Sequence, residues 1–344
     1  MRKSFLLLVF IFLIFSLEYC TRRVSPEMAS YQPAPVKLNI PPGFPYMSMA
    51  MDNPPTREGI DLGRMLFFDP FIDKDHKRTC GGCHLPDSCF TSKKENSLAQ
   101  INLVWNNAFL WNGKVEGLLE DIMIFEVDSF FKTDLNKLNH HKKYPLLFKK
   151  AFGVDKITSK EVGYALAQFE RTMISCNSKY DRYLRNDVAL TPQEENGRKI
   201  YFTEKGDCFH CHGTILLTDN SFHNNGLDSF PAKGRYEITH NRKDLGKYKA
   251  PTLRNIGLTA PYMHDGRFKN LKEVIDFYSE RVKWSPTIDP LMKKVKRGGV
   301  RLNEQEKQDL LAFLETFTDT IFIGNPSFSD PFQVGMIKQK KRPK

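Results

Sequence analysis

The most informative residues of this chain form two short stretches of one pattern, Cys80-Gly81-Gly82-Cys83-His84 and Cys208-Phe209-His210-Cys211-His212. C-x-x-C-H is the attachment pattern of a c-type haem. Cysteines three positions apart lie on one side of a helical turn, so both thiols can bond to the two vinyl groups of one porphyrin. The histidine that follows supplies the proximal ligand of the iron. The pattern therefore predicts two covalently bound haems, with His84 and His212 as proximal ligands.

Three other interpretations of these cysteines fit less well. A thioredoxin-type dithiol is expected in a βαβ context, which neither stretch has. Zinc half-sites lie close together in sequence, whereas Cys83 and Cys208 stand in different halves of the chain. Disulfides would suit an exported chain, but two C-x-x-C-H stretches, one in each half, favour haem. Cys89 and Cys176 belong to neither stretch and are either buried thiols or paired with each other in a disulfide.

Length and composition indicate a globular protein of two domains. A chain of 344 residues exceeds the usual size of one domain. Hydrophobic residues make up 40 % and charged residues 26 %, which is not the composition of a membrane bundle or a disordered chain. The net charge of +11 suits an acidic partner. The sequence has no aromatic-basic RNA-binding pattern and no phosphate-binding glycine loop, so nucleic acid is not an expected partner.

The N-terminus has the form of an export signal. Two basic residues precede an apolar run over residues 5–17, which is too short to span a membrane and has the length of a secretory signal. We therefore expect a signal peptide over residues 1–19 and a periplasmic protein. Cys20 is a candidate lipid acceptor and membrane tether, with simple cleavage nearby or an uncleaved anchor as alternatives. Residues 20–56 contain eight prolines and are expected to form an extended tether.

Helix signals dominate the rest of the chain. Thr191 with Glu194, and Asn303 with Glu306, have the spacing of capping boxes that open helices. The second of these helices carries an apolar stripe made of Leu310, Leu311, Leu314 and Phe317. A helix before C-x-x-C-H and another near the end of the domain are what a small cytochrome c needs to enclose its haem.

The first half repeats this order. Residues 57–68 are expected to form a helix before Cys80, and residues 159–175 a late amphipathic helix. No convincing run of alternating polar and apolar residues predicts a strand. The fold class is therefore all-α, with two cytochrome-c-like haem domains packed together and long irregular loops. We expect a first domain, a linker, a second domain and a basic tail, over residues 57–176, 177–190, 191–325 and 326–344.

Longer motifs give a resemblance to a known family. They follow one another in order as Leu62-Gly63-Arg64-Met65-Leu66-Phe67-Phe68-Asp69-Pro70, Asn107-Ala108-Phe109-Leu110-Trp111-Asn112-Gly113-Lys114, Ala250-Pro251-Thr252-Leu253-Arg254-Asn255 and Thr259-Ala260-Pro261-Tyr262-Met263-His264-Asp265-Gly266. With the two haem motifs between them, the chain resembles the bacterial di-haem cytochrome c peroxidase family, including its MauG-type branch. The resemblance extends over most of the chain after the expected tether.

The resemblance implies roles for residues between the haems. Trp111 stands where the family has a tryptophan that relays electrons. Thr259 and Pro261 stand where family members give backbone carbonyls to a calcium ion between the domains. The family's third protein ligand is an asparagine in a segment that is altered here, and Gln100 or Asn102 is its expected substitute.

The second axial ligand of the C-terminal haem has two candidates by different arguments. Methionine is a common ligand in cytochromes c, which favours Met263 or Met292. Family spacing instead places Tyr278 at the position that is Met in peroxidases and Tyr in MauG-type proteins. A phenolate favours ferric iron and lowers its potential, whereas a thioether does the reverse. Tyr278 is the preferred prediction, with a core aromatic as its structural alternative.

The N-terminal haem should be the peroxide site, and here the chain departs from the family. The family has a glutamine and then a glutamate, which moves a proton between the peroxide oxygens. Here Asp121 and Phe131 stand at those two positions, so Glu126 and Asp128 are expected as displaced substitutes for the glutamate. The other histidines of this half are expected at the surface: His76, His140 and His141.

Two classes of function follow. In the first, an enzyme passes electrons from an acidic donor, such as a small cytochrome, through the C-terminal haem and Trp111 to hydrogen peroxide at the N-terminal haem, or oxidises a protein substrate. In the second, a non-enzymatic electron-transfer or sensing protein retains the two haems and the electron path between them but lacks the acid–base glutamate. The enzyme is preferred, and the sequence leaves the oligomeric state open.

Overall fold

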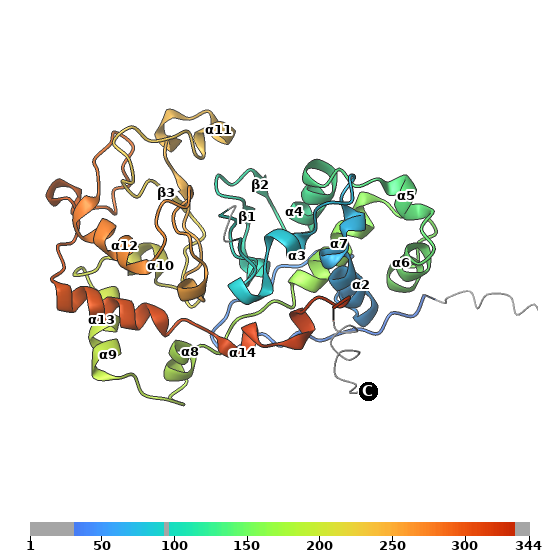
Figure 1. Cartoon of the computed structure of the whole chain (residues 1–344), viewed down its shortest axis with the longest axis horizontal. Coiled ribbons are helices and arrows are strands. Elements are labelled where there is room, and N and C mark those ends of the chain that lie inside the picture. Colours follow the sequence, from blue (N-terminus) through green and yellow to red (C-terminus); the bar gives the residue numbers. More distant parts are fainter. Residues whose placement is uncertain (1–30, 93–95, 334–344) are drawn as a thin grey trace, which may run out of the picture.

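The computed structural model describes residues 31–92 and 96–333 (Figure 1). It has two helical lobes, one for each haem motif, with the β1–β2 segment between them. The expected signal peptide and Cys20 lie outside the described residues. Within the described ranges, no helix combines the length and apolar character that crossing a membrane requires.

The first lobe is built on two crossed helices, α2 (Arg57–Phe68) and α7 (Ser159–Glu170). Gly63 sits at the crossing, where an added Cβ would lie 1.9 Å from the backbone oxygen of Ala165. The remaining α-helices of this lobe are α3 (Cys80–Cys83), α4 (Leu119–Phe125), α5 (Leu135–Asn139) and α6 (Tyr144–Phe152). The late helix thus ends at Glu170, earlier than the sequence suggested.

The second lobe repeats the arrangement with α9 (Pro192–Tyr201) and α13 (Glu304–Glu315). Gly197 sits at this crossing, where an added Cβ would lie 2.0 Å from the backbone oxygen of Asp309. Both capping boxes predicted from the sequence are present at the starts of these two helices. The other α-helices of this lobe and its linker are α8 (Lys179–Leu184), α10 (Phe209–His212), α11 (Tyr236–Thr239) and α12 (Leu271–Asp276). The last helix, α14 (Thr320–Ile323), lies against the first lobe.

Strands are few in the described ranges. There are two antiparallel pairs of two-residue strands. In one, β1 (Ala108–Phe109) pairs with β2 (Val115–Glu116), and in the other, β3 (Phe222–His223) pairs with β4 (Tyr248–Lys249). Short 3₁₀ turns occupy Pro70–Ile72, Pro86–Ser88, Leu103–Trp105, Arg242–Asp244, Ile256–Leu258, Val295–Arg297 and Pro326–Phe328. The all-α prediction with long irregular loops is confirmed.

Two π-helical turns occupy matching places in the two lobes. The turn Glu126–Phe130 continues α4, and the turn Phe277–Arg281 continues α12. A π turn adds one residue to a helix and is frequent at functional sites. Each turn carries a side chain of one of the cavities described below.

The C-terminal end returns to the first lobe. Figure 1 shows the chain after α13 running beneath both lobes, through α14, toward α2. Phe322 and Phe328 are buried in the core that contains α2 and α7. Asp319, which is 1 % exposed, accepts hydrogen bonds from the backbone N–H groups of Cys176 and Asn177. The sequence division put Phe322 in the second domain and Phe328 in the tail, whereas both pack in the first core, because the sequence shows their apolar character but not their partners.

The proline-rich segment also packs on the body. Residues 31–56 are extended, as expected, but the ring of Phe44 lies 5.1 Å from that of Trp105 and beneath the guanidinium of Arg254. The Asn53 side chain is buried and donates to Glu120. The described part of the expected tether thus packs against the body, because it carries apolar and amide groups that the body buries.

Candidate di-haem site

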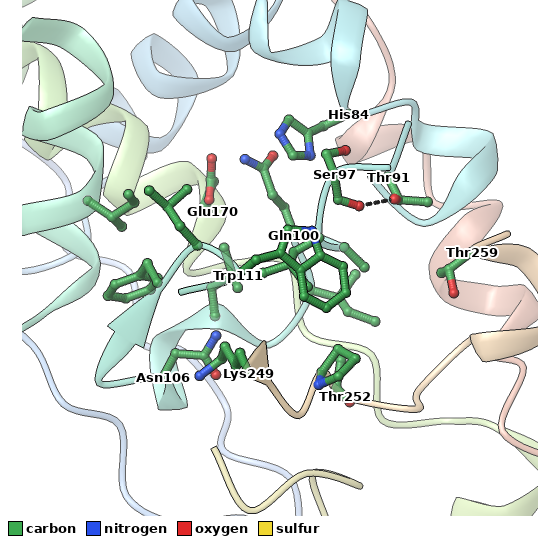
Figure 2. Close-up of a pocket in the computed structure, with 18 of the residues that line it drawn as sticks. His84, Thr91, Ser97, Gln100, Asn106, Trp111, Glu170, Lys249, Thr252 and Thr259 are labelled. Carbon is green, nitrogen blue, oxygen red and sulfur yellow. Dashed lines mark hydrogen bonds between the residues drawn. The ribbon is translucent and has the colours of Figure 1, made fainter. Parts of the chain in front are cut away.

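The first cavity, of about 330 Å³, lies beside the first C-x-x-C-H stretch. Thr79 caps α3 by accepting from the N–H of Gly82 at 2.8 Å, which places Cys80 and Cys83 on the cavity wall. His84 follows, and its Nδ1 lies 2.8 Å from the backbone oxygen of Phe90. A nitrogen bonded to a carbonyl must carry the proton, so Nε2 keeps its lone pair for a metal. Figure 2 shows His84 at the edge of this cavity.

The second cavity has the same construction. Its walls include Cys208 and Cys211, both with free thiols, and His212. Nδ1 of His212 lies 3.0 Å from the backbone oxygen of Leu217, which again leaves Nε2 unprotonated. Two cysteines, an oriented imidazole and a largely apolar wall are the donor set and the surroundings that a c-type haem requires. The residues of both cavities therefore fit the two haems that the sequence predicts.

Two carboxyl groups share the first cavity. Glu126 and Glu170 both line it, and Glu170 is 1 % exposed. Burial raises the pKa of Glu126 to about 7. Burial, and then the charge of Glu126, raise the pKa of Glu170 well above its usual value. Neither oxygen of Glu170 has a hydrogen-bond partner among the described residues. Burial thus raises the pKa of both carboxyl groups of this cavity, that of Glu126 to about 7.

Asp128 does not belong to this cavity. It is exposed and accepts a hydrogen bond from the Ser159 hydroxyl at 2.5 Å. Glu126 and Asp128 are two positions apart in a helical turn, so their side chains leave it in nearly opposite directions. The geometry therefore supports only Glu126 as the displaced acid–base group and removes Asp128.

Glu170 was not predicted, although the sequence holds a weak signal for it. Leu166 lies on the buried stripe of α7, and Glu170 follows it by one helical turn at the end of the helix, just before the buried Met173. A glutamate on an apolar stripe is either paired or functional. The signal gives no distance to other groups, so the sequence alone could not place Glu170 in a cavity with His84.

Trp111 lies between the two cavities. It lines both, and its Nε1 donates to the backbone oxygen of Asn96 at 3.1 Å. The backbone oxygen of Trp111 accepts from the N–H of Lys249 at 2.9 Å. This position is the one that an electron relay between two haems would need.

Tyr278 and Met263 both line the second cavity. Nδ2 of Asn225 lies 3.0 Å from the Tyr278 hydroxyl oxygen and 3.5 Å from the Met263 sulfur. Burial raises the pKa of Tyr278 to about 12, while the hydrogen bond from Asn225 opposes that rise. Met292 lines the same cavity. The structure keeps the three candidate ligands within one cavity and gives Tyr278 a donor suited to a phenolate oxygen.

The residues expected to bind calcium are only partly brought together. Thr259 and Pro261 line the first cavity. The Asn102 side chain is already bonded to the backbone of Ser175: its Nδ2 donates to the Ser175 oxygen at 3.0 Å, and its Oδ1 accepts from the Ser175 N–H at 2.8 Å. It therefore offers no free ligand atom. Gln100 points toward His84 in Figure 2, away from Thr259.

A different amide lies closer to the expected calcium carbonyls. Asn96 donates to the backbone oxygen of Met263 at 2.6 Å. An added Cβ on Gly266 would lie 3.1 Å from Pro261 and 3.3 Å from Asn96, so the two are neighbours. Among the described residues, Asn96 is therefore a better candidate than Asn102 for the third ligand.

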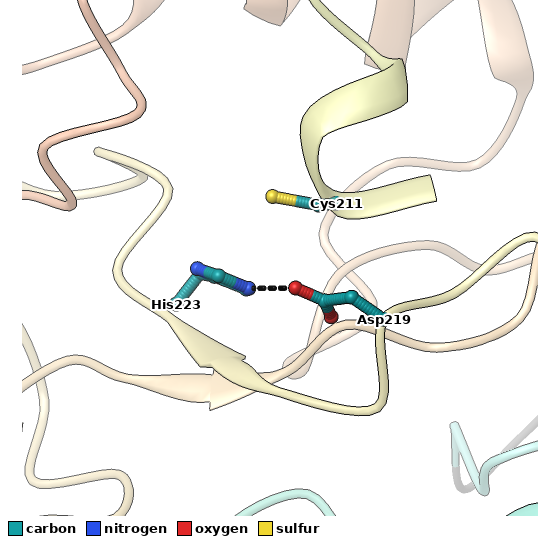
Figure 3. A group of neighbouring side chains, drawn as sticks. All are labelled: Cys211, Asp219 and His223. Atoms are coloured by element: carbon teal, nitrogen blue, oxygen red, sulfur yellow. Dashed lines mark hydrogen bonds and ion pairs between the residues drawn. The ribbon is translucent and has the colours of Figure 1, made fainter. Parts of the chain in front are cut away.

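A charged group that the sequence did not indicate lies beside Cys211. His223 sits between two carboxylates, with Nε2 2.7 Å from Asp219 and Nδ1 2.7 Å from Asp289. Figure 3 shows the imidazole and Asp219 next to the Cys211 sulfur. Burial opposes the charge, but the bonds to Asp219 and Asp289 raise the pKa of His223 to about 12. The second cavity therefore has, beside Cys211, an imidazole whose charged form two carboxylates favour.

The remaining cysteines and histidines lie outside this chemistry. Cys89 and Cys176 are both free thiols, so the alternative in which they pair is not what the structure shows. The three histidines expected at the surface do not line either cavity: His76, His140 and His141.

Comparison with known proteins agrees with this geometry. The family model described as di-haem cytochrome c peroxidase matches residues 57–189. The methylamine utilization protein MauG of Methylorubrum extorquens is 30 % identical over 284 residues, covering 77 % of this chain and 79 % of that protein. The cytochrome c551 peroxidase of Nitrosomonas europaea is 29 % identical, and the match covers 81 % of this chain and 84 % of that protein.

A solved structure supports the same assignment. The crystal structure of a MauG-like protein associated with microbial copper homeostasis has a TM-score of 0.78 and 31 % identity, and covers 86 % of this chain and 99 % of its own. The protein class defined by the fold and the paired cavities is thus a di-haem c-type cytochrome. The chain belongs to the di-haem cytochrome c peroxidase family, which includes the MauG proteins.

Proposed function

We propose that this protein reduces hydrogen peroxide with electrons from a donor protein, and that peroxide reacts in the cavity beside His84. The observation that carries the proposal is the half-buried carboxyl group of Glu126 on the wall of that cavity, where partial burial raises its pKa to about 7. A pure electron-transfer protein needs no proton-transferring group there, whereas peroxide cleavage does. Relatives named as peroxidases support the same reaction class.

Glu126 performs the proton transfer in this proposal. Reduction of H₂O₂ to two water molecules consumes two electrons and two protons, and one proton must move between the peroxide oxygens before the bond between them breaks. The Glu126 carboxylate accepts that proton from one oxygen and returns it to the other. Glu170 remains protonated and can donate a hydrogen bond within the cavity. The bound haem supplies the redox chemistry.

Electrons enter through the second lobe in this proposal. Trp111, which lines both cavities, carries them toward the first. Tyr278 would hold the iron of the second haem, with the donor from Asn225 placed to stabilise its phenolate, and Met263 would be the alternative ligand. A net charge of +11 favours an acidic donor such as a small cytochrome. We place the protein in the periplasm on its expected export signal, with Cys20 as an optional membrane tether.

Calcium is the remaining part of the proposal. The backbone carbonyls of Thr259 and Pro261 would hold it, with Asn96 nearby. Such an ion would connect the two lobes close to Trp111.

Peroxide turnover by the haem-loaded protein tests this function. In Glu126→Gln we expect kcat/KM for peroxide to fall by about 10²- to 10⁴-fold, the usual contribution of an acid–base group. In the wild type, kcat/KM should decline as the pH falls through about 7, because protonated Glu126 no longer accepts a proton. The variant should lose that inflection while its absorption spectrum stays unchanged.

Asp128→Asn is the matched control, because Asp128 is exposed on the same turn. It should turn over peroxide like the wild type. Equal rates for the wild type and Glu126→Gln would remove the acid–base role. Turnover by the wild type no faster than that of a cytochrome c with both axial positions filled would remove the peroxidase function itself.

A further inference from the structure

Lys249 is a buried cation without a counter-charge. It lies on β4, is 5 % exposed, and its Nζ has no hydrogen-bond partner among the described residues. No carboxylate of those residues lies within 4.0 Å of it. The face of the Phe222 ring lies 5.8 Å away, which is at the limit of a cation–π contact, and Asp219 acts on the group only from beyond ion-pair distance. The described residues therefore leave this ammonium group without a hydrogen bond or a direct ion pair.

Such an arrangement is unstable unless an anion completes it. Moving an unpaired ammonium group out of water costs several kcal/mol, so buried charges are paired in native proteins. Burial lowers the pKa of Lys249 only to about 8, and Asp219 opposes the fall, so the group is still mainly charged at neutral pH. The buried Nζ thus points to a negatively charged group that is not part of the polypeptide.

The position of Lys249 identifies that group by its chemistry. Six side chains line both cavities, and Lys249 is the charged one among them: Trp111, Lys249, Pro251, Ile256, Tyr262 and Met263. Figure 2 shows Lys249 next to Asn106 at the end of the first cavity that lies away from His84. Each haem bound in these cavities carries two propionate carboxylates. A carboxylate is the anion that pairs best with a lysine in a dry site.

We propose that Lys249 Nζ binds a haem propionate at the junction of the two cavities. The backbone N–H of Lys249 donates to the backbone oxygen of Trp111 at 2.9 Å, so the ion pair would lie beside the tryptophan. Lys249 would then act as a positioning residue, because it would fix one haem edge next to Trp111. Its charge would also favour the reduced state of that haem, since reduction adds an electron near a cation.

Redox titration of the haem-loaded protein without peroxide tests the assignment. In Lys249→Met, which keeps the length and removes the charge, we expect a tenfold loss in the ratio of reduced to oxidised form of one haem at a fixed potential. For a one-electron couple this corresponds to about 59 mV. Lys249→Arg should retain most of the wild-type ratio. The haem whose spectrum shifts identifies which cavity supplies the propionate.

Lys243→Met is the matched control, because Lys243 is an exposed lysine of the same lobe. It should leave both haem couples unchanged. The proposal is overturned if Lys249→Met leaves both couples at their wild-type values, or if Lys249→Arg shifts them as far as Lys249→Met does. The resonance Raman band of propionate bending should move in Lys249→Met and stay in place in the control.

A second measurement covers the case in which Lys249→Met does not load haem. A crystal structure of the wild-type haem protein should place Lys249 Nζ within 4 Å of a propionate oxygen, and a longer separation from every propionate overturns the proposal. The inference rests on the two haems of the proposed function but not on turnover. Failure of peroxide turnover with shifted potentials would reject the peroxidase function alone, and unshifted potentials with normal turnover would reject the role of Lys249 alone.

Discussion

Glu170 lines the first cavity as a buried carboxyl group, and neither of its oxygens has a hydrogen-bond partner among the described residues. Burial and then the charge of Glu126 raise its pKa well above the usual value, so folding favours its protonated form. In the unfolded chain it ionises near its usual pKa of 4.5. Between these two values folding takes up a proton, so this group lowers stability as the pH rises, and it has no such effect below pH 4.5.

Glu170→Gln should therefore stabilise the protein in a pH-dependent way, because glutamine mimics the protonated acid. We expect no gain in the free energy of unfolding at pH 4 and a gain that grows toward pH 8, by at most about 1.4 kcal/mol per pH unit. Urea unfolding at several pH values measures it. Glu315→Gln, on an exposed position of α13, is the control and should show no such trend. A gain independent of pH would contradict the protonated state.

Tyr278 makes a second prediction at this scale. If its oxygen ligates the iron, Tyr278→Phe should change the ferric absorption spectrum of one haem and raise its potential, because a phenolate favours the ferric state. Met263→Leu, in the same cavity, should leave the ferric spectrum unaltered. The opposite pattern, with the change in Met263→Leu only, would assign the thioether as the ligand.

Single residues differ in how well the sequence could place them. His84 and His212 were predictable because covalent attachment forces ligand and cysteines into one pentapeptide. Glu126 was predicted only together with Asp128, because the sequence does not show the direction in which each leaves the turn. The contacts of Glu170 and Lys249 depend on segments far away in the chain, and no local pattern encodes them.

At the scale of elements, each lobe depends on one glycine at a helix crossing. Gly63 and Gly197 allow α2 to approach α7, and α9 to approach α13, at distances where a methyl group would overlap a backbone oxygen. The helix before each C-x-x-C-H stretch and the late helix are thereby held together at one point. Capping boxes predicted the starts of α9 and α13, and apolar stripes predicted the buried faces of α7 and α13, but neither signal identifies the helix that each one crosses.

Gly63→Ala should separate α2 from α7 and lower the free energy of unfolding by roughly 2 kcal/mol or more, the range of an overpacked core. Gly197→Ala should do the same in the second lobe. Chemical denaturation of the haem-loaded protein measures both. Gly257→Ala is the control, because its Cβ would lie at an ordinary 3.5 Å from Thr318. A loss in all three variants alike would refute the argument from the crossings.

The π turns mark the limit of prediction for elements. Helical periodicity identifies a helix but not a single inserted residue, and both turns follow helices of only six or seven residues. The insertion redirects the side chains after it, which is why Glu126 enters its cavity while Asp128 does not. Counting positions from Trp111 could not include that change of direction.

For the whole molecule, the C-terminal end connects the lobes. Asp319 is the centre of the connection: its carboxylate accepts from the N–H groups of Cys176, Asn177 and Phe322, and its own N–H donates to Asn255. Buried N–H groups that lose a charged acceptor are costly, because water does not replace it.

Asp319→Ala should therefore lower the free energy of unfolding by roughly 3 kcal/mol. Thermal or urea unfolding of the haem-loaded protein measures the loss. Asp155→Ala is the control, because Asp155 forms an exposed ion pair with Lys149 and should matter by less than about 1 kcal/mol. Equal effects of the two substitutions would show that Asp319 does not hold the lobes together.

The return of the C-terminal end has a consequence for the order of assembly. During synthesis the first lobe emerges long before Phe322 and Phe328, yet these two rings complete its core. The earliest part of the chain must therefore wait, incompletely closed, for the last. The first lobe thus reaches its final packing only after the second lobe has been made, although every residue of its C-x-x-C-H stretch is already present.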